Sequence, residues 1–462
     1  MMMDWLHKQI WLKDKPKIIS WGAAALGVFF GQAFLLSQSQ LALTYPDTPT
    51  YVYYAQTLLH GTSIGNYQRT VGYPLFLLPF IIGGEHYKAV VIVQILLALI
   101  GFVEIYGLVY NLTQNRIYPA LTVILLSLDL EYIQFERTVL TEELSIFCAI
   151  TFFYMLERYL ALHKKKYVAA AMVTLGFMVV VRPAFIYLPV VIAAGIVMYH
   201  YFCAKIPRAW LTAILALLVP YGCLFWQITL NYLSPIHYFG LTNVSNINNF
   251  GKILKYHMEL LTTDPKYTAL KRAAAAYVAS GKYQPVIFVE KYPQFADPSN
   301  SFVGAYTNEI ISQHKWLYAR NNIRDIISAF TTKPYLLGFA HKGLEPLLYT
   351  MTNISQLTVY TLFPVIILFY LVQLIMKRTL QHRDALMLVL AVAALGMVLI
   401  AAVGSFNSYD RLRIPFEWAV YSVVIYGLAA AAKQIAALCS RLLRRSAGYV
   451  RNMKIVYFSR TK

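Results

Sequence analysis

Long apolar segments recur along this chain, and they constrain its fold more than any other feature. A helix needs about 20 apolar residues to cross the hydrocarbon core of a bilayer. Ten segments meet or approach this length: 18–36, 87–110, 118–132, 139–157, 167–182, 184–201, 209–230, 356–376, 384–404 and 414–437. Only 13% of the residues are charged, about half the share in a soluble domain. We therefore predict an all-α polytopic membrane protein with about ten transmembrane helices.

The basic residues predict the orientation of these helices. Lys and Arg gather in every second connecting segment, including 8–17, 158–166 and the C-terminal tail 433–462. The short loops on the opposite side hold only Arg69, Arg137, Arg182, Arg411 and Arg413. Because cytoplasmic loops of membrane proteins carry an excess of Lys and Arg, both termini are predicted inside. The net charge of +19 then reflects membrane topology, and no nucleic-acid partner is needed to explain it.

The predicted helices divide the chain into three regions. Residues 1–230 form an N-terminal transmembrane core that includes a first outer loop, 37–86. In that loop, two runs near 48–59 and 72–82 are too short to span and are predicted to lie at the membrane surface. Residues 231–335 form a large extracytoplasmic helical region that we expect to pack on the membrane core. Residues 336–462 supply the last transmembrane helices and a basic cytoplasmic tail.

Acidic residues crowd into two of the outer loops. Asp47 stands before the first surface helix, where it would serve equally well as a helix N-cap or as part of a site. The second outer loop, SLDLEYIQFERTVLTEELSIF, holds five acids between Asp129 and Glu143, with Arg137 among them. Acids favour a helix N-terminus, but this density in a chain with 21 acids indicates a site.

Arginines on the same face suit an anionic ligand. Arg411 and Arg413 precede the final predicted helix, and Arg182 precedes Pro183 at another outer junction. A guanidinium group can bind a phosphate through two parallel hydrogen bonds, although a single such arginine would more simply bind lipid headgroups. A carboxylate beside several arginines fits a reaction in which a hydroxyl attacks a sugar whose leaving group is a lipid phosphate. No Walker A sequence is present.

These motifs, in this order, resemble the GT-C superfamily of polyprenyl-phosphate-sugar-dependent glycosyltransferases, particularly bacterial relatives of protein O-mannosyltransferases and lipid A aminoarabinose transferases. The first-loop pattern of the family is matched here by Asp47, Tyr51, Ala55, Gly61, Arg69 and Gly72-Tyr73-Pro74. The second-loop pattern, an Arg followed five residues later by an acid, is matched by Arg137 and Glu142. VRPAFIYLP, RLRIP and IRDIISAFTTKPYLLGF resemble later family segments.

The resemblance implies an inverting transfer with Asp47 as the base. Relatives often carry Asp where this chain has Glu142, so the second acid is expected to contact a substrate hydroxyl, ligate a metal or act as a second carboxylate. Glu136 and Glu143 compete for that position. The implied phosphate-binding residues are Arg69, Arg182, Arg411 and Arg413, and the implied substrate-binding residues are Tyr51, Tyr73, Glu136, Arg137 and Glu143.

The resemblance also implies the partners. The donor is expected to be a polyprenyl-phosphate-linked sugar, and the acceptor a glycan, a lipid or a protein, in contact with membrane lipid. A divalent metal ion between Asp47 and Glu142 stays an open alternative. The expected location is a bacterial inner membrane with an extracytoplasmic site, and an endoplasmic reticulum membrane has the same sidedness. Two other functions remain open: a flippase or transporter of lipid-linked glycans, and an oligosaccharide polymerase or ligase.

Overall fold

The computed structural model describes residues 2–38, 40–203, 208–333, 336, 338–339, 343–377, 382–406 and 409–459. The basic side chains at 8–15 and in the tail beyond 440, which we expect on the cytoplasmic side, lie outside this description. The described residues are helical almost throughout. Their one β-type contact is an isolated bridge between Leu43 and Thr138. The predicted all-α membrane fold is confirmed.

The helices follow one another with short connections. The α-helices are α1 (Met2–Leu36), α2 (Thr48–Leu59), α3 (Gly72–Ile81), α4 (Tyr87–Thr113), α5 (Ile117–Ser127), α6 (Leu130–Ile133), α7 (Thr141–Leu162), α8 (Lys165–Val181), α9 (Leu188–Phe202), α10 (Ala209–Leu233), α11 (Val244–Lys255), α12 (Thr268–Ala279), α13 (Pro285–Lys291), α14 (Ser301–Gln313), α15 (Lys315–Thr331), α16 (Glu345–Lys377), α17 (His382–Gly404), α18 (Tyr409–Arg413) and α19 (Glu417–Ser459). Short 3-10 turns are η1 (Gln134–Arg137), η2 (Pro183–Tyr187), η3 (Pro265–Tyr267), η4 (Pro293–Phe295) and η5 (Ile414–Phe416).

Among the described residues, eight helices are long and apolar enough to cross a bilayer, or nine if one bent pair counts as a single span. This is fewer than the ten expected. The segment expected at 118–132 ends as α5 at Ser127, and the chain then turns by 65° into residues 130–137. The segment expected at 167–182 is α8, which has 17 residues and therefore a length of about 25 Å. Helix α8 nevertheless packs between α7 and α10.

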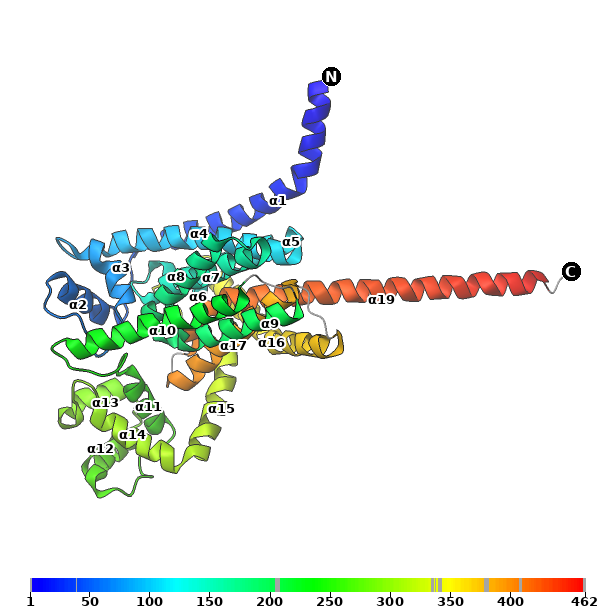
Figure 1. Cartoon of the computed structure of the whole chain (residues 1–462). Coiled ribbons are helices and arrows are strands. Elements are labelled where there is room, and N and C mark those ends of the chain that lie inside the picture. The colour runs from blue at the N-terminus through cyan, green and yellow to red at the C-terminus, as the bar shows by residue number, and fades with distance from the viewer. Residues whose placement is uncertain are drawn as a thin grey trace.

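One end of the bundle carries the two helices of the first loop and lies beside the helices of residues 244–331. Figure 1 shows α2 and α3 at this end, beside the layer formed by α11–α15, whereas the C-terminal part of α19 extends from the opposite end. We call the first end the capped end and α11–α15 the cap. The two short runs predicted for the first loop are confirmed as α2 and α3, and Gly61 follows the first of them with a φ of +66°. The first of the two loops that the sequence marked as acidic, which precedes α2, therefore lies at the capped end.

The cap has a hydrophobic core of its own, separate from that of the bundle. Phe250, Tyr277, Phe288 and Tyr306 are buried in it. We expect this region to pack on the membrane core, and its described residues also form this hydrophobic cluster of their own. The predicted helix at 265–280 is present as η3 and α12, and the stretch 301–330 forms two helices, α14 and α15.

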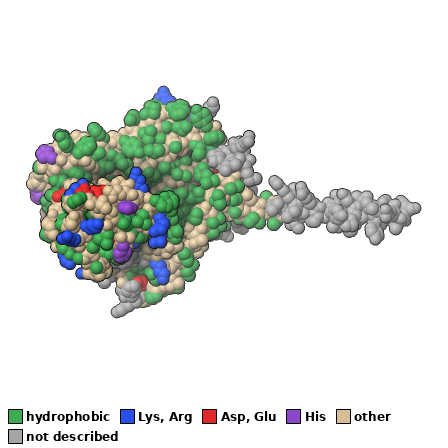
Figure 2. Space-filling view, turned by 90° about the horizontal axis from the view of Figure 1, so that it is seen from below, with side chains coloured by type: hydrophobic (Ala, Val, Ile, Leu, Met, Phe, Trp, Pro, Cys, Tyr) green, Lys and Arg blue, Asp and Glu red, His purple; other side chains and the backbone are tan. Residues whose placement is uncertain are grey.

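Buried charges attach the cap to the bundle. Lys252 of α11 lies 2.9 Å from Asp325 of α15 and donates to the carbonyl of Ala402 on α17 at 2.6 Å. Lys255 also pairs with Asp325, at 3.0 Å. Charged side chains on the outside of the cap contrast with the apolar flank of the bundle beside it (Figure 2). An apolar flank suits contact with lipid, and a charged outer surface suits contact with water.

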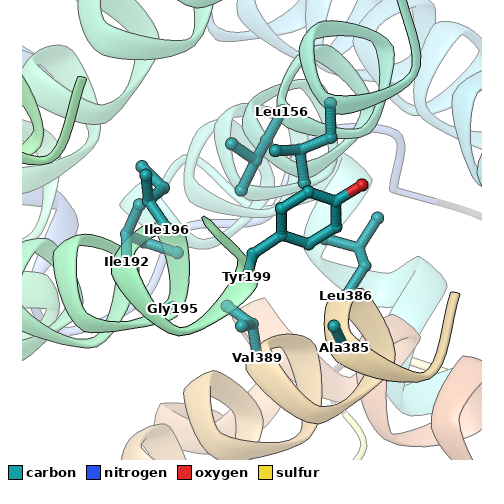
Figure 3. A pocket seen from close by; sticks show the side chains of 9 residues that line it. Leu156, Ile192, Gly195, Ile196, Tyr199, Ala385, Leu386 and Val389 are labelled. Atoms are coloured by element: carbon teal, nitrogen blue, oxygen red, sulfur yellow. The ribbon is translucent and has the colours of Figure 1, made fainter. Parts of the chain in front are cut away.

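A glycine allows two of the spanning helices, α9 and α17, to approach each other closely. Gly195 on α9 faces Val389 on α17, and a Cβ atom at Gly195 would lie 2.6 Å from a methyl carbon of that valine. Figure 3 shows the apolar side chains around this contact, including Leu156 of α7 and Tyr199 of α9. The close approach of α9 to α17 thus depends on a residue without a side chain, as is common between membrane helices.

Candidate active site

The first-loop acid is held in place by a pairing between two distant segments. The amide of Leu43 donates to the carbonyl of Arg137 at 2.8 Å, and the amide of Val139 donates to the carbonyl of Leu43 at 3.0 Å. The hydroxyl of Thr48 then donates to the carbonyl of Val139 at 2.9 Å. These bonds fix the chain before α2 against the start of α7. They explain why acids from two separate loops meet.

Asp47 is bound by two arginines. Its Oδ1 accepts from Nη2 of Arg69 at 2.8 Å, and its Oδ2 lies 2.8 Å from Nη1 of Arg411. Asp47 does occupy the N-cap position of α2, but its side chain accepts no capping hydrogen bond. Helix capping is therefore not what this carboxylate does. Its side chain remains 33% exposed, so it is the part of the cluster that a substrate can reach.

Arg411 joins Asp47 to a second, fully buried acid. Its Nε donates to Oε1 of Glu142 at 2.6 Å, and Nη1 of Arg182 lies 3.3 Å from the same oxygen. Glu142 is in the first turn of α7, Arg182 follows α8, and Arg411 is in the five-residue helix α18. We call these residues, Asp47, Arg69, Glu142, Arg182 and Arg411, the arginine–carboxylate cluster.

Tyrosine rings support two of the guanidinium groups. Arg69 lies over the ring of Tyr51 at 4.4 Å, and Arg411 lies over the ring of Tyr45 at 4.4 Å. Arg69 also donates from Nε to the hydroxyl of Thr50 at 2.7 Å. Cation–π and hydrogen-bond contacts of this kind fix the direction of a long side chain. Sequence analysis missed Tyr45 and Thr50, although both stand within three residues of Asp47.

The two arginines keep Asp47 ionised. Burial alone would raise the pKa of Asp47, but the charges of Arg411 and Arg69 and their hydrogen bonds hold it below the ordinary value for an aspartate. The cluster contains three guanidinium groups and two carboxylates, which leaves one net positive charge. A cluster of this kind can accept an additional anion.

The arrangement does not fit a divalent metal ion. Both oxygens of Asp47 and one oxygen of Glu142 already face guanidinium groups, and Arg411 lies between the two carboxylates. Within the described part of the chain, no three His, Cys, Asp or Glu side chains come together as metal ligands would. A metal between Asp47 and Glu142 would have to displace Arg411.

Arg413, which we grouped with the phosphate-binding arginines, lies in a different network. It is 1% exposed and donates to the carbonyl of Ala329 at 2.6 Å and to Oε1 of Gln356 at 2.9 Å. Its guanidinium carbon is 4.1 Å from the ring centre of Tyr360. Its Nη2 also lies 3.6 Å from Oε2 of Glu131, so the described contacts of Arg413 join α18 to α6, α15 and α16. None of them is with Asp47 or Glu142.

The remaining predicted site residues also lie away from Asp47. Arg137 donates to the carbonyls of Gln40 and Gly338 at 3.1 and 2.9 Å, which fixes loops rather than side chains of the cluster. Tyr73 is buried, donates to Gln94 at 3.1 Å and touches Tyr51 edge to face at 5.3 Å. It thus packs against Tyr51, the residue whose ring lies under Arg69.

Within the described part of the chain, two of the predicted acids are buried without a cation beside them. Glu136 accepts from Nε2 of Gln32 at 2.6 Å, and neither carboxylate oxygen of Glu143 has a hydrogen-bond partner. Both acids were candidates for the position that Glu142 holds. Among the described contacts of these three acids, only those of Glu142 are with the arginines of the cluster.

The region around Glu142 matches a known protein family. Residues 73–226 match the family model described as dolichyl-phosphate-mannose-protein mannosyltransferase. The match covers about a third of the chain, and this region is similar to membrane glycosyltransferases of the GT-C type. The matched region includes Glu142 and Arg182, and it ends before Arg411. No curated protein sequence shows significant similarity to the chain.

Three solved structures resemble the chain at low identity. The apo oligosaccharyltransferase of Archaeoglobus fulgidus is 13% identical with a TM-score of 0.49, and the match covers 93% of this chain and 52% of that one. AglB of the same organism, in complex with an inhibitory peptide and a dolichol-phosphate, is 12% identical with a TM-score of 0.46, covering 93% and 52%. The same oligosaccharyltransferase tethered to an acceptor peptide is 13% identical with a TM-score of 0.47, covering 91% and 50%. The chain thus spans about half the length of these structures.

Proposed function

We propose that this protein is a GT-C-type inverting glycosyltransferase that moves a sugar from a polyprenyl-phosphate donor to an acceptor hydroxyl. The reaction would take place at the capped end of the bundle, beside Asp47. The observation that carries the proposal is the arginine–carboxylate cluster, in which Arg411 is shared between an accessible carboxylate and a buried one. The family match at residues 73–226 supports the reaction class.

The donor phosphate would bind to the arginines. Arg69 and Arg411 are 15% and 14% exposed, so their guanidinium groups border the accessible side of the cluster. The net positive charge of the cluster would be neutralised by the phosphate. As the glycosidic bond breaks, negative charge grows on the departing polyprenyl phosphate. Fixed guanidinium groups in a partly dry site stabilise such charge strongly.

Asp47 would act as the general base. The acceptor oxygen attacks the anomeric carbon from the face opposite the phosphate, the carbon–oxygen bond to the phosphate breaks, and the hydroxyl proton passes to Asp47. Because its pKa is held low by Arg411 and Arg69, the carboxylate is available as a proton acceptor at any physiological pH. Proton transfer to a positioned side chain contributes about 10²–10⁴ in rate.

Glu142 would position Arg411 rather than touch the substrate. It is fully buried and binds Nε of Arg411, which leaves the Nη1 side of the same guanidinium group directed at Asp47. Arg182 balances the charge of Glu142 from behind. Such supporting contacts fix a catalytic group within the small tolerance that reactions require.

The proposed side of the membrane for the site rests on the distribution of basic residues among the loops. The loops that carry the cluster hold few basic residues, so the capped end is proposed to face away from the cytoplasm. A bacterial inner membrane is the proposed location, and the acceptor is proposed to be a glycan, lipid or protein presented on that side.

Native mass spectrometry of the purified protein tests donor binding directly. We expect the wild type to retain added polyprenyl monophosphate and Arg411→Gln to bind it at least tenfold more weakly. Arg324→Gln, which removes an exposed arginine from the cap, serves as the matched control and should bind as the wild type does. Absence of binding by the wild type, or equal loss in both variants, would contradict the proposal. Transport of a lipid-linked glycan across proteoliposomes without a covalent product would favour a flippase instead.

A further inference from the structure

Helix α15 carries a stripe of exposed apolar side chains. Trp316 is 80% exposed, Ile323 54% and Ile327 59%. Successive residues of an α-helix are about 100° apart, so these three side chains lie within about 40° of one another around the helix axis. Single exposed apolar residues are common, but a row of large ones on one helix indicates a surface that meets something other than water.

Basic side chains border this stripe on both sides. Arg320 and Arg324 lie on one side of Trp316 and Lys315 on the other, at about 40–100° around the helix, and all three are exposed. The ion pairs found among the described residues include none of these three. Their charges are therefore available to an outside anion. We call the six residues together the α15 face: Lys315, Trp316, Arg320, Ile323, Arg324 and Ile327.

The opposite side of α15 is fixed against the cap. Asn322 accepts a hydrogen bond from Lys252 of α11, and Asp325 lies 2.9 Å from the same lysine. Tyr318 donates to Asn249 of α11 at 3.0 Å. These side chains lie on the half of the helix opposite Trp316. The α15 face therefore points away from α11.

The direction of α15 turns this face toward the bilayer. Figure 1 shows α15 running across the direction of the spanning helices α4 and α10, with α11 and α14 on the side away from the C-terminal part of α19. The end of α15 is held in the bundle, because Ala329 accepts from Arg413 at 2.6 Å and Phe330 packs edge-on against Tyr360 of α16 at 6.3 Å. Figure 2 shows basic side chains along the side of the cap that borders the apolar flank.

We infer that the α15 face binds the headgroups of anionic phospholipids in the leaflet at the capped end. Trp316, Ile323 and Ile327 enter the boundary between headgroups and acyl chains, while the three basic side chains pair with phosphates. Amphipathic helices with basic borders bind anionic membrane surfaces in this way. A zwitterionic bilayer offers the same apolar contact but no net negative charge for the three cations. The charges thus select the lipid, and the contact holds the cap close to the bilayer.

Hydrogen exchange of the whole protein in nanodiscs tests this inference. The comparison is between discs of phosphatidylcholine alone and discs that also contain phosphatidylglycerol. One basic residue near an anionic surface contributes a factor of about five in binding, so we expect the amides of residues 315–324 to exchange at least about fivefold more slowly in the anionic discs. Concentrated sodium chloride should remove this difference, because salt screens charges at a surface.

Two triple variants locate the effect. Lys315→Gln, Arg320→Gln and Arg324→Gln together should abolish the difference between the discs. Arg272→Gln, Lys282→Gln and Lys291→Gln together remove the same charge from exposed positions elsewhere in the cap and should keep it. Thermal unfolding in detergent checks that each variant is folded, and the salt comparison on the wild type needs no variant. Donor binding is measured in detergent, which has no anionic surface, so its Arg324→Gln control is unaffected.

Three results would overturn the inference. One is equal exchange of the wild type in both kinds of disc, which would leave only apolar contact. Another is an equal loss in both triple variants, which would show general attraction of the cap to negative lipid. The third is slow exchange in detergent that depends on protein concentration, which would assign the face to a second copy of the chain. Because no polyprenyl phosphate is used, these outcomes are independent of the proposed transferase activity.

Discussion

Arg411 and Glu142 are 269 positions apart, and Nε of the arginine donates to Oε1 of the glutamate at 2.6 Å. The same guanidinium group binds Asp47 through Nη1 at 2.8 Å. One side chain on a short helix therefore connects an accessible carboxylate on the first loop to a buried carboxylate at the start of α7. The predictions below follow from this connection.

Asp47→Asn should abolish sugar transfer while leaving the fold intact. The amide cannot accept the hydroxyl proton, so we expect kcat to fall by about 10²–10⁴. Binding of polyprenyl monophosphate should be retained or tightened, because the cluster gains positive charge. Glu85→Gln is the control, since Glu85 is an exposed acid of the same loop. Transfer by Asp47→Asn at the wild-type rate would remove Asp47 from the reaction.

Glu142→Gln should lower both the stability and the transfer activity of the protein, whereas Glu143→Gln at the neighbouring position should lower neither. Loss of the Glu142 charge leaves Arg182 and Arg411 buried with too few partners, so we expect a destabilisation of about 3–5 kcal/mol and a large loss of transfer. Glu143→Gln removes a carboxylate whose oxygens have no hydrogen-bond partner, and it should be neutral or stabilising. Thermal unfolding in detergent measures both. The reverse ranking would show that the wrong glutamate has been assigned.

Arg411→Lys and Arg413→Lys should separate ligand binding from stability. A lysine at 411 cannot reach Asp47 and Glu142 together in the geometry of the guanidinium fork, so donor affinity should fall about tenfold or more. A lysine at 413 loses at least one hydrogen bond to Ala329 or Gln356, and the free energy of unfolding should fall by about 1.5–3 kcal/mol. Isothermal binding of polyprenyl monophosphate and thermal unfolding give the two readouts. If Arg413→Lys weakened donor binding more than Arg411→Lys did, the assignment of ligand binding to Arg411 and of stability to Arg413 would be wrong.

The pH profile of transfer should depend on Arg69. The pKa of Asp47 is lowered in the folded protein. The stabilising contribution of its ionised form is therefore present above the unfolded pKa of about 3.9 and is lost only as the pH falls through the lower folded value. We expect kcat/KM of the wild type to show no acid limb due to Asp47 between pH 7 and 5. Arg69→Gln removes one positive charge, so its acid limb should move to higher pH. Identical acid limbs in the wild type and in Arg69→Gln would contradict an effect of the Arg69–Asp47 ion pair on the pKa of Asp47.

The membrane fold and the candidate site differ in how far local sequence could predict them. Apolar length predicted the spanning helices, but the segment predicted at 118–132 ran past the break after Ser127, because the polar residues there do not by themselves reveal a bend of 65°. Asp47, Arg69, Glu142, Arg182 and Arg411 were all candidates, and the structure brings these five together. The support from Tyr45 and the buried network around Arg413 depend on contacts between distant segments.

The sequence by itself determined the class of the protein and the set of acids and arginines worth considering, and it predicts the sidedness of the loops. Each of these follows from composition, segment length or charge position, which are local properties. Only the tertiary structure decided between Glu142 and Glu143, and between Arg411 and Arg413. Neighbouring residues on an α-helix point about 100° apart and alternate residues about 200° apart. Which of them meets Asp47 therefore depends on the rotation of α7 and α18, and packing of the whole bundle sets that rotation.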